Sequence, residues 1–237
     1  MRRPELVIAE DAGRFARAAA EVISQELLAA IERRGRCSVA LAGGRTPAAV
    51  YEELALRHLA KRIPLGGLHA YFSDERCVPP DDPASNYRMV YESLLQNGTL
   101  VPGGIHRIEA ERPDLDRVAA EYETLLPVRP DVLLLGMGAD GHTASLFPGS
   151  PILEETDRRV APSRGGAPDL WRITITPRVI GESRSVVVLV SGPEKAGMVA
   201  RALQGPWDPK RIPVQLAWGG RWVLDREAAR DLNHAVR

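Results

Sequence analysis

The chain has 237 residues and carries 31 lysines and arginines against 31 aspartates and glutamates, so its formal net charge is zero. This balance argues against binding to duplex nucleic acid, which normally requires an excess of basic residues. Apolar residues make up 44% of the chain, enough for a substantial core, and no apolar run approaches the roughly 20 residues of a membrane span.

Short apolar runs alternate with longer amphipathic segments through the first half of the chain. The helix predicted at 14–32 has apolar residues at helical spacing and ends before Gly35. A polar loop that reaches Pro83 follows the third predicted strand. The predicted strands of this half are 6–9, 38–42, 68–73 and 105–108, and the predicted helices are 14–32, 47–58, 86–96 and 115–126.

The second half begins with an uninterrupted apolar run at 132–135, bounded by Gly136, which is typical of a central strand covered on both faces. Beyond Pro151 the pattern is more typical of β structure. Strands are predicted at 158–161, 171–176, 185–191 and 214–218, and helices at 194–203 and 225–232, the last with Asp225 as its N-cap.

The alternation of strands and helices predicts a mostly parallel, Rossmann-like doubly wound α/β sheet with helices on both faces, together with a smaller C-terminal β-rich portion. The sequence has no internal repeat, low-complexity tract or linker, so residues 1–237 are predicted to form a single α/β domain. Ligands of such sheets bind beyond the carboxyl ends of the strands. A binding site is therefore expected in the loops that follow the predicted strands.

The first such loop contains Gly43, Gly44, Arg45, Thr46 and Pro47, between a predicted strand and a predicted helix. The exposed backbone N–H groups and the helix dipole favour an anion such as phosphate. Arg45 adds charge, the Thr46 hydroxyl adds a donor or a helix cap, and Pro47 suits the first helical position. An ordinary strand-to-helix turn is the alternative, and the Gly-Lys-Ser/Thr ending of triphosphate-binding loops is absent.

A second loop places Asp74, Glu75 and Arg76 at the end of a predicted strand. A carboxylate beside a guanidinium at a strand tip can orient a sugar or stabilise a developing negative charge. A solvated charged turn is the alternative interpretation of these three residues.

The third loop contains a G-x-G-x-x-G pattern at Gly136, Gly138 and Gly141. We reject a dinucleotide site, because the residues between Gly141 and the next proline are too few for the helix that binds a pyrophosphate. The same loop presents Asp140 and His142. Such an imidazole can accept a proton from water near neutral pH, and a neighbouring carboxylate can fix its tautomer.

Lys195 lies in the first turn of another predicted helix, where the helix dipole disfavours a cation unless an anion lies between them. A lysine that simply points into solvent is the alternative. The five histidines and the two cysteines, Cys37 and Cys77, lack the spacing of a zinc site or a disulfide framework. The N-terminal residues lack a signal-peptide pattern, so we expect a cytoplasmic protein without a structural metal.

Several segments form a recognisable combination: AGGRTP, SDERCVPPDDPASNYR, LLLGMGADGHTASLFPGS, RITIT, SGPEKA and WGGRWVLDREAA. In this order and spacing they resemble the 6-phosphogluconolactonase family of the glucosamine/galactosamine-6-phosphate isomerase superfamily, over nearly the whole chain. The resemblance implies hydrolysis of 6-phospho-D-glucono-1,5-lactone to 6-phospho-D-gluconate in the oxidative pentose phosphate pathway, with no metal or organic cofactor. The implied partner is this small lactone, with no nucleic acid and no membrane, and the chain is a monomer or small homo-oligomer.

The resemblance also implies the roles of individual residues. His142 acts as general base on water, Asp140 orients its imidazole, and Arg76 or loop amides stabilise the oxyanion. Asp74 holds a sugar hydroxyl or orients Arg76. The residues expected to bind the phosphate are Gly43, Gly44, Arg45, Thr46 and Lys195, with Arg172 as a further contact.

One departure from the family pattern and two alternative functions remain open. Many relatives have an Ala-Pro-Lys run before the RIT segment, whereas this chain has Ser163 and Arg164, so Arg164 either replaces that lysine or belongs to a flexible flap. A glucosamine-6-phosphate deaminase/isomerase typically has Asp-Glu-Tyr in place of Asp-Glu-Arg at 74–76. A non-catalytic sugar-phosphate sensor normally carries a helix-turn-helix segment, for which the α/β pattern leaves no room.

Overall fold

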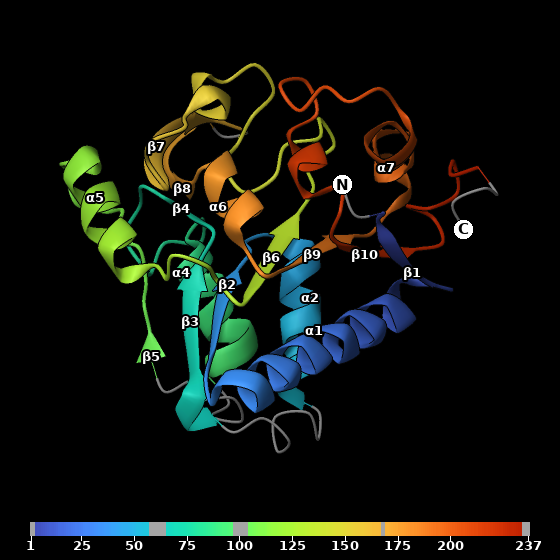
Figure 1. The fold of residues 1–237 in the computed structure, drawn as a ribbon, viewed down its shortest axis with the longest axis horizontal. Coiled ribbons are helices and arrows are strands. Elements are labelled where there is room, and N and C mark those ends of the chain that lie inside the picture. Colours follow the sequence, from blue (N-terminus) through green and yellow to red (C-terminus); the bar gives the residue numbers. More distant parts are fainter. Residues whose placement is uncertain (1–2, 57–64, 97–103, 167–168, 234–237) are drawn as a thin grey trace.

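A parallel seven-stranded sheet forms the centre of the fold in the computed structural model, which describes residues 3–56, 65–96, 104–166 and 169–233 (Figure 1). The strand order is β1-β10-β9-β6-β2-β3-β5, and all neighbouring strands are parallel. The apolar runs of the central strands β2 and β6 are almost entirely buried. The strands are β1 (Glu5–Ala9), β2 (Cys37–Leu41), β3 (Leu68–Phe72), β5 (Gly104–Ile105), β6 (Val132–Gly136), β9 (Ser185–Val190) and β10 (Arg221–Asp225).

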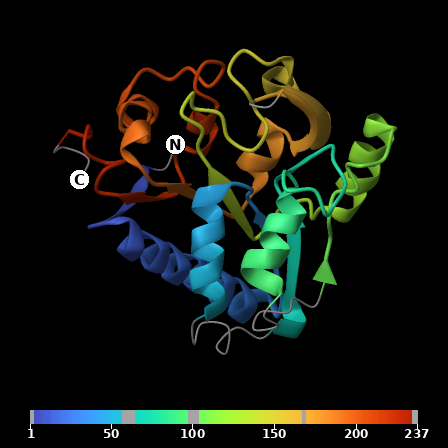
Figure 2. The ribbon, with the colours of Figure 1, turned by 180° about the vertical axis from the view of Figure 1, so that it is seen from behind.

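The longer helices cover the sheet from two sides. Figures 1 and 2 show α1, α2 and α4 gathered on one side and α5, α6 and α7 on the other. In its first half the chain adds strands in the direction of β5, and in its second half it adds them in the direction of β10. Because connections between parallel strands are right-handed, the helices of the two halves lie on opposite faces of the sheet. The helices are α1 (Ala12–Arg34), α2 (Arg45–Leu56), α4 (Asn86–Val90), α5 (Leu115–Leu125), α6 (Pro177–Glu182) and α7 (Ala196–Gln204). The doubly wound prediction is confirmed.

Shorter helical segments complete the described chain. A π-helical segment, Tyr91–Leu95, extends α4, so the predicted helix at 86–96 is a composite. The 3-10 segments are Leu65–Gly67, Pro151–Glu154, Pro193–Lys195 and Pro213–Ala217. Residues 57–58, the end of the helix predicted at 47–58, lie outside the described residues.

A small antiparallel sheet lies beside the main one and corresponds to the predicted β-rich portion. It has the order β4-β8-β7, formed by β4 (Asp74–Arg76), β7 (Val160–Gly165) and β8 (Leu170–Ile175). The first of these strands follows β3 along the chain almost directly. The small sheet therefore pairs β7 and β8, from the second half of the chain, with the segment that directly follows β3 of the main sheet.

Two predictions near the C-terminus are wrong. The predicted strand at 214–218 is the 3-10 helix Pro213–Ala217, and the strand is β10, which pairs with β1 and β9. Both segments have apolar runs, which do not by themselves distinguish a strand from a buried helical turn. The helix predicted at 225–232 is a series of turns. Asp225 ends β10, and its carboxylate accepts a hydrogen bond from the Ala228 N–H group. This bond caps a turn and not the predicted helix.

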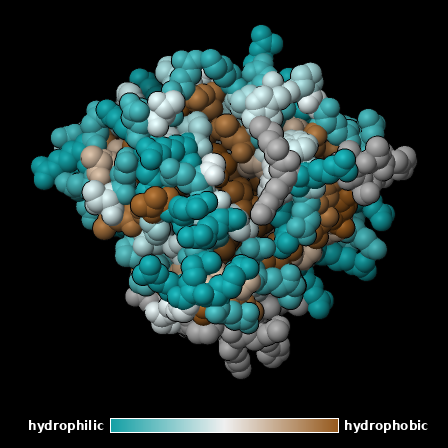
Figure 3. Space-filling view, viewed as in Figure 1, coloured by the Kyte–Doolittle hydropathy of each residue, from teal (hydrophilic) through white to brown (hydrophobic). Residues whose placement is uncertain are grey.

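Hydrophilic side chains cover most of the face drawn in Figure 3, and a hydrophobic patch is visible over the edge formed by β1 and β10. Ile8 of β1 is among the exposed large hydrophobic residues. Among the helices of the described ranges, none combines the length and hydrophobicity that crossing a bilayer requires.

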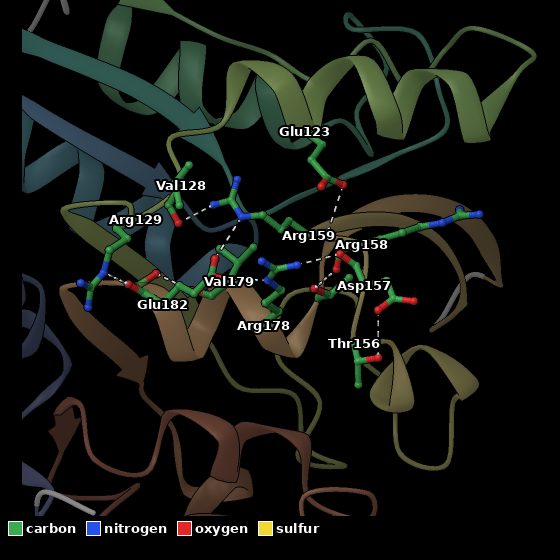
Figure 4. Close-up of polar contacts among 12 residues, drawn as sticks. Glu123, Val128, Arg129, Thr156, Asp157, Arg158, Arg159, Arg178, Val179 and Glu182 are labelled. Atoms are coloured by element: carbon green, nitrogen blue, oxygen red, sulfur yellow. Dashed lines mark hydrogen bonds and ion pairs between the residues drawn. The ribbon is translucent and has the colours of Figure 1, made fainter.

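A buried arginine anchors the small sheet to the rest of the fold (Figure 4). Arg159 is only 6% exposed, and its Nε donates to Glu182 of α6 at 3.0 Å. Its terminal nitrogens donate to the carbonyl oxygens of Leu126, Pro127 and Val128. A buried guanidinium is tolerated only when its donors find acceptors in this way.

Replacing Arg159 by alanine is expected to lower the free energy of unfolding by about 3–5 kcal/mol, because buried acceptors lose their donor. The matched control is Arg178→Ala, which removes a 44%-exposed partner of the same Glu182 carboxylate. This control should lower the free energy of unfolding by less than about 1 kcal/mol. Urea titrations followed by circular dichroism measure both, and equal losses would contradict the assignment.

Candidate active site

A cleft of about 540 Å³ opens at the carboxyl edge of the parallel sheet, where the loops after β2, β3, β6 and β9 meet. These strands are consecutive neighbours, and the winding direction reverses between β6 and β2, where doubly wound sheets bind ligands. The predicted site residues that line the cleft are Gly43, Gly44, Arg45, Thr46, Asp74, Arg76, His142, Arg172 and Lys195. The remaining one, Asp140, hydrogen-bonds to His142.

The imidazole of His142 is oriented by a short hydrogen bond. Its Nδ1 lies 2.6 Å from Oδ1 of Asp140. A carboxylate only accepts, so Nδ1 carries the proton and Nε2 keeps a lone pair. The hydrogen bond from His142 lowers the pKa of Asp140 below its ordinary value, although partial burial opposes this effect. The side chain of His142 is 33% exposed, so a small molecule in the cleft can reach its ring.

Glycine at position 138 allows this pair to lie against the backbone. A methyl group on Gly138 would be 2.1 Å from Nδ1 of His142 and 2.5 Å from Oδ1 of Asp140. Gly141 adopts φ 86°, a left-handed conformation that favours glycine. Residues 137–150 form turns rather than a helix. The glycine pattern therefore serves a tight loop, and the helix on which a dinucleotide site depends is missing from these residues.

The segment at 74–76 is a strand, not a solvated turn. Asp74 and Arg76 line the cleft, whereas Glu75 points to the opposite face because side chains alternate along a strand. The Glu75 carboxylate accepts from the backbone N–H groups of Arg76, Asn86 and Tyr87. Burial raises the pKa of Glu75, and these three donors oppose the increase. Glu75 therefore fixes β4 to the start of α4, while its two neighbours face the cleft.

The buried carboxylate of Asp74 joins β4 to the start of α4 and to the loop after β6. Its oxygens accept from the Ser145 hydroxyl at 2.6 Å, from Asn86 Nδ2 at 3.1 Å and from the Ser73 hydroxyl at 3.3 Å. Asn86 also lines the cleft, and a methyl group on Gly43 would lie 1.9 Å from its Oδ1. No local sequence pattern marks Asn86 or Ser145 as a site residue. Both lie within the segments that carry the family resemblance, which was the available signal.

Arg172 is held at the cleft by an aromatic ring and a carbonyl group. It is 7% exposed, its Nε donates to Gly165 O at 3.1 Å, and its guanidinium lies 5.4 Å from the Phe147 ring centre. The same ring contacts the His142 imidazole, with centroids 4.9 Å apart. Burial lowers the pKa of Arg172. Arg172 also pairs in register with Arg76 across β8 and β4, so two guanidinium groups leave adjacent positions.

Five residues form what we call the anion end of the cleft: Gly43, Gly44, Arg45, Thr46 and Lys195. Arg45 and Thr46 lie in the first turn of α2. Gly44 has φ 104°, and its carbonyl accepts from the Ala48 N–H group. The helix begins at Arg45, so Thr46 lies in the first turn rather than capping it. The first N–H groups of a helix have no acceptor within it and are available to an anion.

Lys195 approaches the anion end from the loop after β9. The 3-10 segment Pro193–Lys195 precedes α7, and Lys195 lines the cleft at this junction. The loop is fixed by the buried Asp225, whose carboxylate accepts from the Ser191 hydroxyl at 2.6 Å and from Gly192 N at 3.0 Å. Strand β10 thus holds the loop that positions this lysine.

Arg164 does not line the cleft. Its guanidinium pairs with Asp169 at 3.1 Å and lies 5.9 Å from the Trp171 ring centre on the small sheet. In this position Arg164 does not replace a lysine that would act in the cleft.

The cleft carries an excess of positive charge, which suits an anionic ligand. Its cationic lining residues are Arg45, Arg76, Arg172 and Lys195, and its carboxylates are Asp74 and Glu194. Within the described ranges, no three histidine, cysteine, aspartate or glutamate side chains come close enough to hold a metal ion. The arrangement can bind an anion at one end and transfer a proton at His142.

Comparisons with known proteins agree on one family. The profile described as "Glucosamine-6-phosphate isomerases/6-phosphogluconolactonase" matches residues 10–224. The 6-phosphogluconolactonase of Mycobacterium tuberculosis is 38% identical over 221 residues, covering 86% of this chain and 88% of that protein. The solved 6-phosphogluconolactonase of Trypanosoma brucei is 30% identical with a TM-score of 0.85, covering 98% of this chain and all of that one. A monomeric glucosamine-6-phosphate deaminase, 19% identical with a TM-score of 0.80, shares the fold.

Replacing Gly43 by alanine should disturb the hydrogen bonds around Asp74, because the new methyl group would overlap the Asn86 amide. We expect the free energy of unfolding to fall by about 1–3 kcal/mol. The matched control is Gly181→Ala in α6, where the methyl group meets nothing within 4 Å. The free energy of unfolding of that control should rise by about 0.4–1 kcal/mol. Urea titration measures both changes, and an unaltered Gly43→Ala variant would refute the packing argument.

Proposed function

The chain belongs to the family of glucosamine-6-phosphate isomerases and 6-phosphogluconolactonases, and on this premise we propose that it hydrolyses 6-phospho-D-glucono-1,5-lactone to 6-phospho-D-gluconate. One observation carries the proposal: Asp140 orients the imidazole of His142 in a cleft whose other segments supply cationic side chains. The relatives named as 6-phosphogluconolactonases support the choice of substrate.

The phosphate group of the substrate binds at the anion end. The amides of Gly43 and Gly44 and the first turn of α2 point at the phosphate oxygens, while Arg45, Thr46 and Lys195 add charge and donors. This remote group holds the lactone ring, so that binding energy orients the carbonyl carbon C1 toward His142. Asp74 accepts a hydrogen bond from a sugar hydroxyl.

His142 supplies the general base. Its Nε2 removes a proton from water as the water oxygen bonds to C1, and the carbonyl π electrons move onto the carbonyl oxygen. The resulting tetrahedral intermediate collapses by breaking the bond between C1 and the ring oxygen. The imidazolium of His142 returns its proton to that leaving oxygen. The products are the open-chain hydroxyl and a carboxylic acid, which ionises at neutral pH.

The oxyanion of the intermediate forms near two arginines. Arg76 is fixed by donation from its Nη1 to Ala84 O at 2.6 Å, and Arg172 by its contacts with Gly165 and Phe147. Fixed positive charge at a developing oxyanion is worth roughly 10²–10³-fold in rate. A lactone is already an activated ester, so a base, this charge and positioning are sufficient without a metal ion or an organic cofactor.

His142→Ala should lower kcat by roughly 10²–10⁴-fold with little change in KM, because it removes the base and leaves the anion end intact. The assay follows acid release from freshly prepared phosphorylated lactone at a pH where spontaneous hydrolysis is slow. His69→Ala, which lies outside the cleft, is the matched control.

Two results would overturn different parts of the proposal. Wild-type protein that releases no acid above the spontaneous rate, or that releases ammonia from glucosamine 6-phosphate instead, excludes the lactonase activity. If His142→Ala keeps activity within a few-fold of wild type, the lactonase remains but the base is another group.

Asp140→Asn tests the orienting role separately. The hydrogen bond from His142 holds the pKa of Asp140 below its ordinary range, so this carboxylate stays ionised throughout the assay range. Asparagine keeps the shape of the side chain but removes the charge that stabilises the imidazolium formed during the reaction. Because the tautomer is no longer fixed, kcat should fall by roughly 10²-fold or more. A kcat of Asp140→Asn within a few-fold of wild type would contradict the orienting role of Asp140.

A further inference from the structure

A second cavity of about 540 Å³ lies at the opposite edge of the main sheet. It is lined by the first residues of three parallel strands, Glu5 of β1, Ser185 of β9 and Arg221 of β10. The last turn of α1, with Arg33 and Arg34, closes another side. The candidate active site lies beyond the carboxyl ends of the strands, so the length of the strands separates the two cavities.

Arginines outnumber carboxylates in this cavity. The arginines that line it are Arg3, Arg33, Arg34, Arg184 and Arg221, and the carboxylates are Glu5, Glu26 and Asp131. The chain as a whole has a formal net charge of zero, so the positive excess of two charges is local. The dipole at the C-terminus of α1 favours the arginines of its last turn but amounts to only about half a charge.

The carboxylates are already engaged. Asp131 Oδ2 accepts from the Ser38 N–H group and hydroxyl, and its Oδ1 pairs with Arg34 at 2.8 Å and Arg184 at 3.4 Å. Arg221 pairs with both glutamates at 2.9 Å. These contacts leave no carboxylate in the cavity for the other arginines.

Two arginines of the cavity, Arg3 and Arg33, are exposed and are left without a carboxylate from its wall. Nε of Arg221 is buried without a hydrogen-bond partner. Within the described ranges, Arg3 and Arg33 have no ion-pair partner among the side chains that line the cavity. The planar guanidinium group presents paired donors that match the oxygens of phosphate. A dianion would neutralise the local excess charge and accept from the guanidinium groups of Arg3 and Arg33.

We propose that this cavity binds a phosphate dianion, either free or as the monoester group of a small metabolite. The volume accommodates a molecule of sugar-phosphate size, for which known ligand pockets span about 300–1,000 Å³. This site is independent of the proposed lactonase activity, because it shares no lining residue with the cleft.

The test is isothermal titration with inorganic phosphate and, separately, with glycerol 3-phosphate at low ionic strength, where charge interactions are least screened. The variant is Arg3→Gln/Arg33→Gln, which removes two charges from the cavity and breaks none of its ion pairs. The matched control, Arg17→Gln/Arg201→Gln, removes two charges from exposed positions outside both cavities. All three proteins keep the anion end of the cleft intact.

Wild type and control should bind phosphate both at the anion end of the cleft and at this second cavity. In Arg3→Gln/Arg33→Gln only the binding at the second cavity should be weakened, by at least tenfold. The circular dichroism spectrum of that variant should match that of wild type, which verifies its fold, and its lactonase activity should be unchanged. At least tenfold tighter binding of glycerol 3-phosphate identifies a monoester site, and equal affinities identify a site for free phosphate. Identical titrations for all three proteins would overturn the proposal, whether or not the chain hydrolyses the lactone.

Discussion

The cleft depends on one buried carboxylate, that of Asp74. A buried charge is stable only when hydrogen bonds replace the water it has lost, and Asp74 obtains them from Ser73, Asn86 and Ser145. These donors come from different segments of the chain. Satisfying Asp74 therefore fixes the positions of β4, the start of α4 and the loop that carries His142, and the same requirement that stabilises the fold aligns the candidate active site.

Close approach of side chains to backbone is the second constraint. The His142–Asp140 pair lies against Gly138, and the Asn86 amide lies against Gly43. In both places any side chain would displace a group that faces the cleft. Gly43 and Gly138 act through the space they leave, whereas Gly44, Gly141 and Gly192 adopt positive φ angles that favour glycine.

The neutral charge of the whole chain conceals two positive regions at opposite edges of one sheet. At the carboxyl edge the cations come from the start of α2, from β4 and β8 of the small sheet and from the segment before α7, so they surround a ligand from several sides. At the amino edge the cations lie at or just before the first residues of the strands and in the last turn of α1. These rigid elements hold the cations apart around the second cavity. Parallel strands produce this separation because all of them begin at one edge and end at the other.

Sequence alone determined the doubly wound sheet and the loops that form the cleft, because both follow from local periodicity and from the rule that parallel strands end at one edge. Tertiary structure decided the rest. The apolar runs at 214–218 and at 221–225 are locally alike, and only pairing with β1 and β9 makes the second one a strand. Likewise, the contacts of Asn86 and Ser145 with Asp74 join residues far apart in the sequence, and no local pattern records which distant partner a polar side chain will meet.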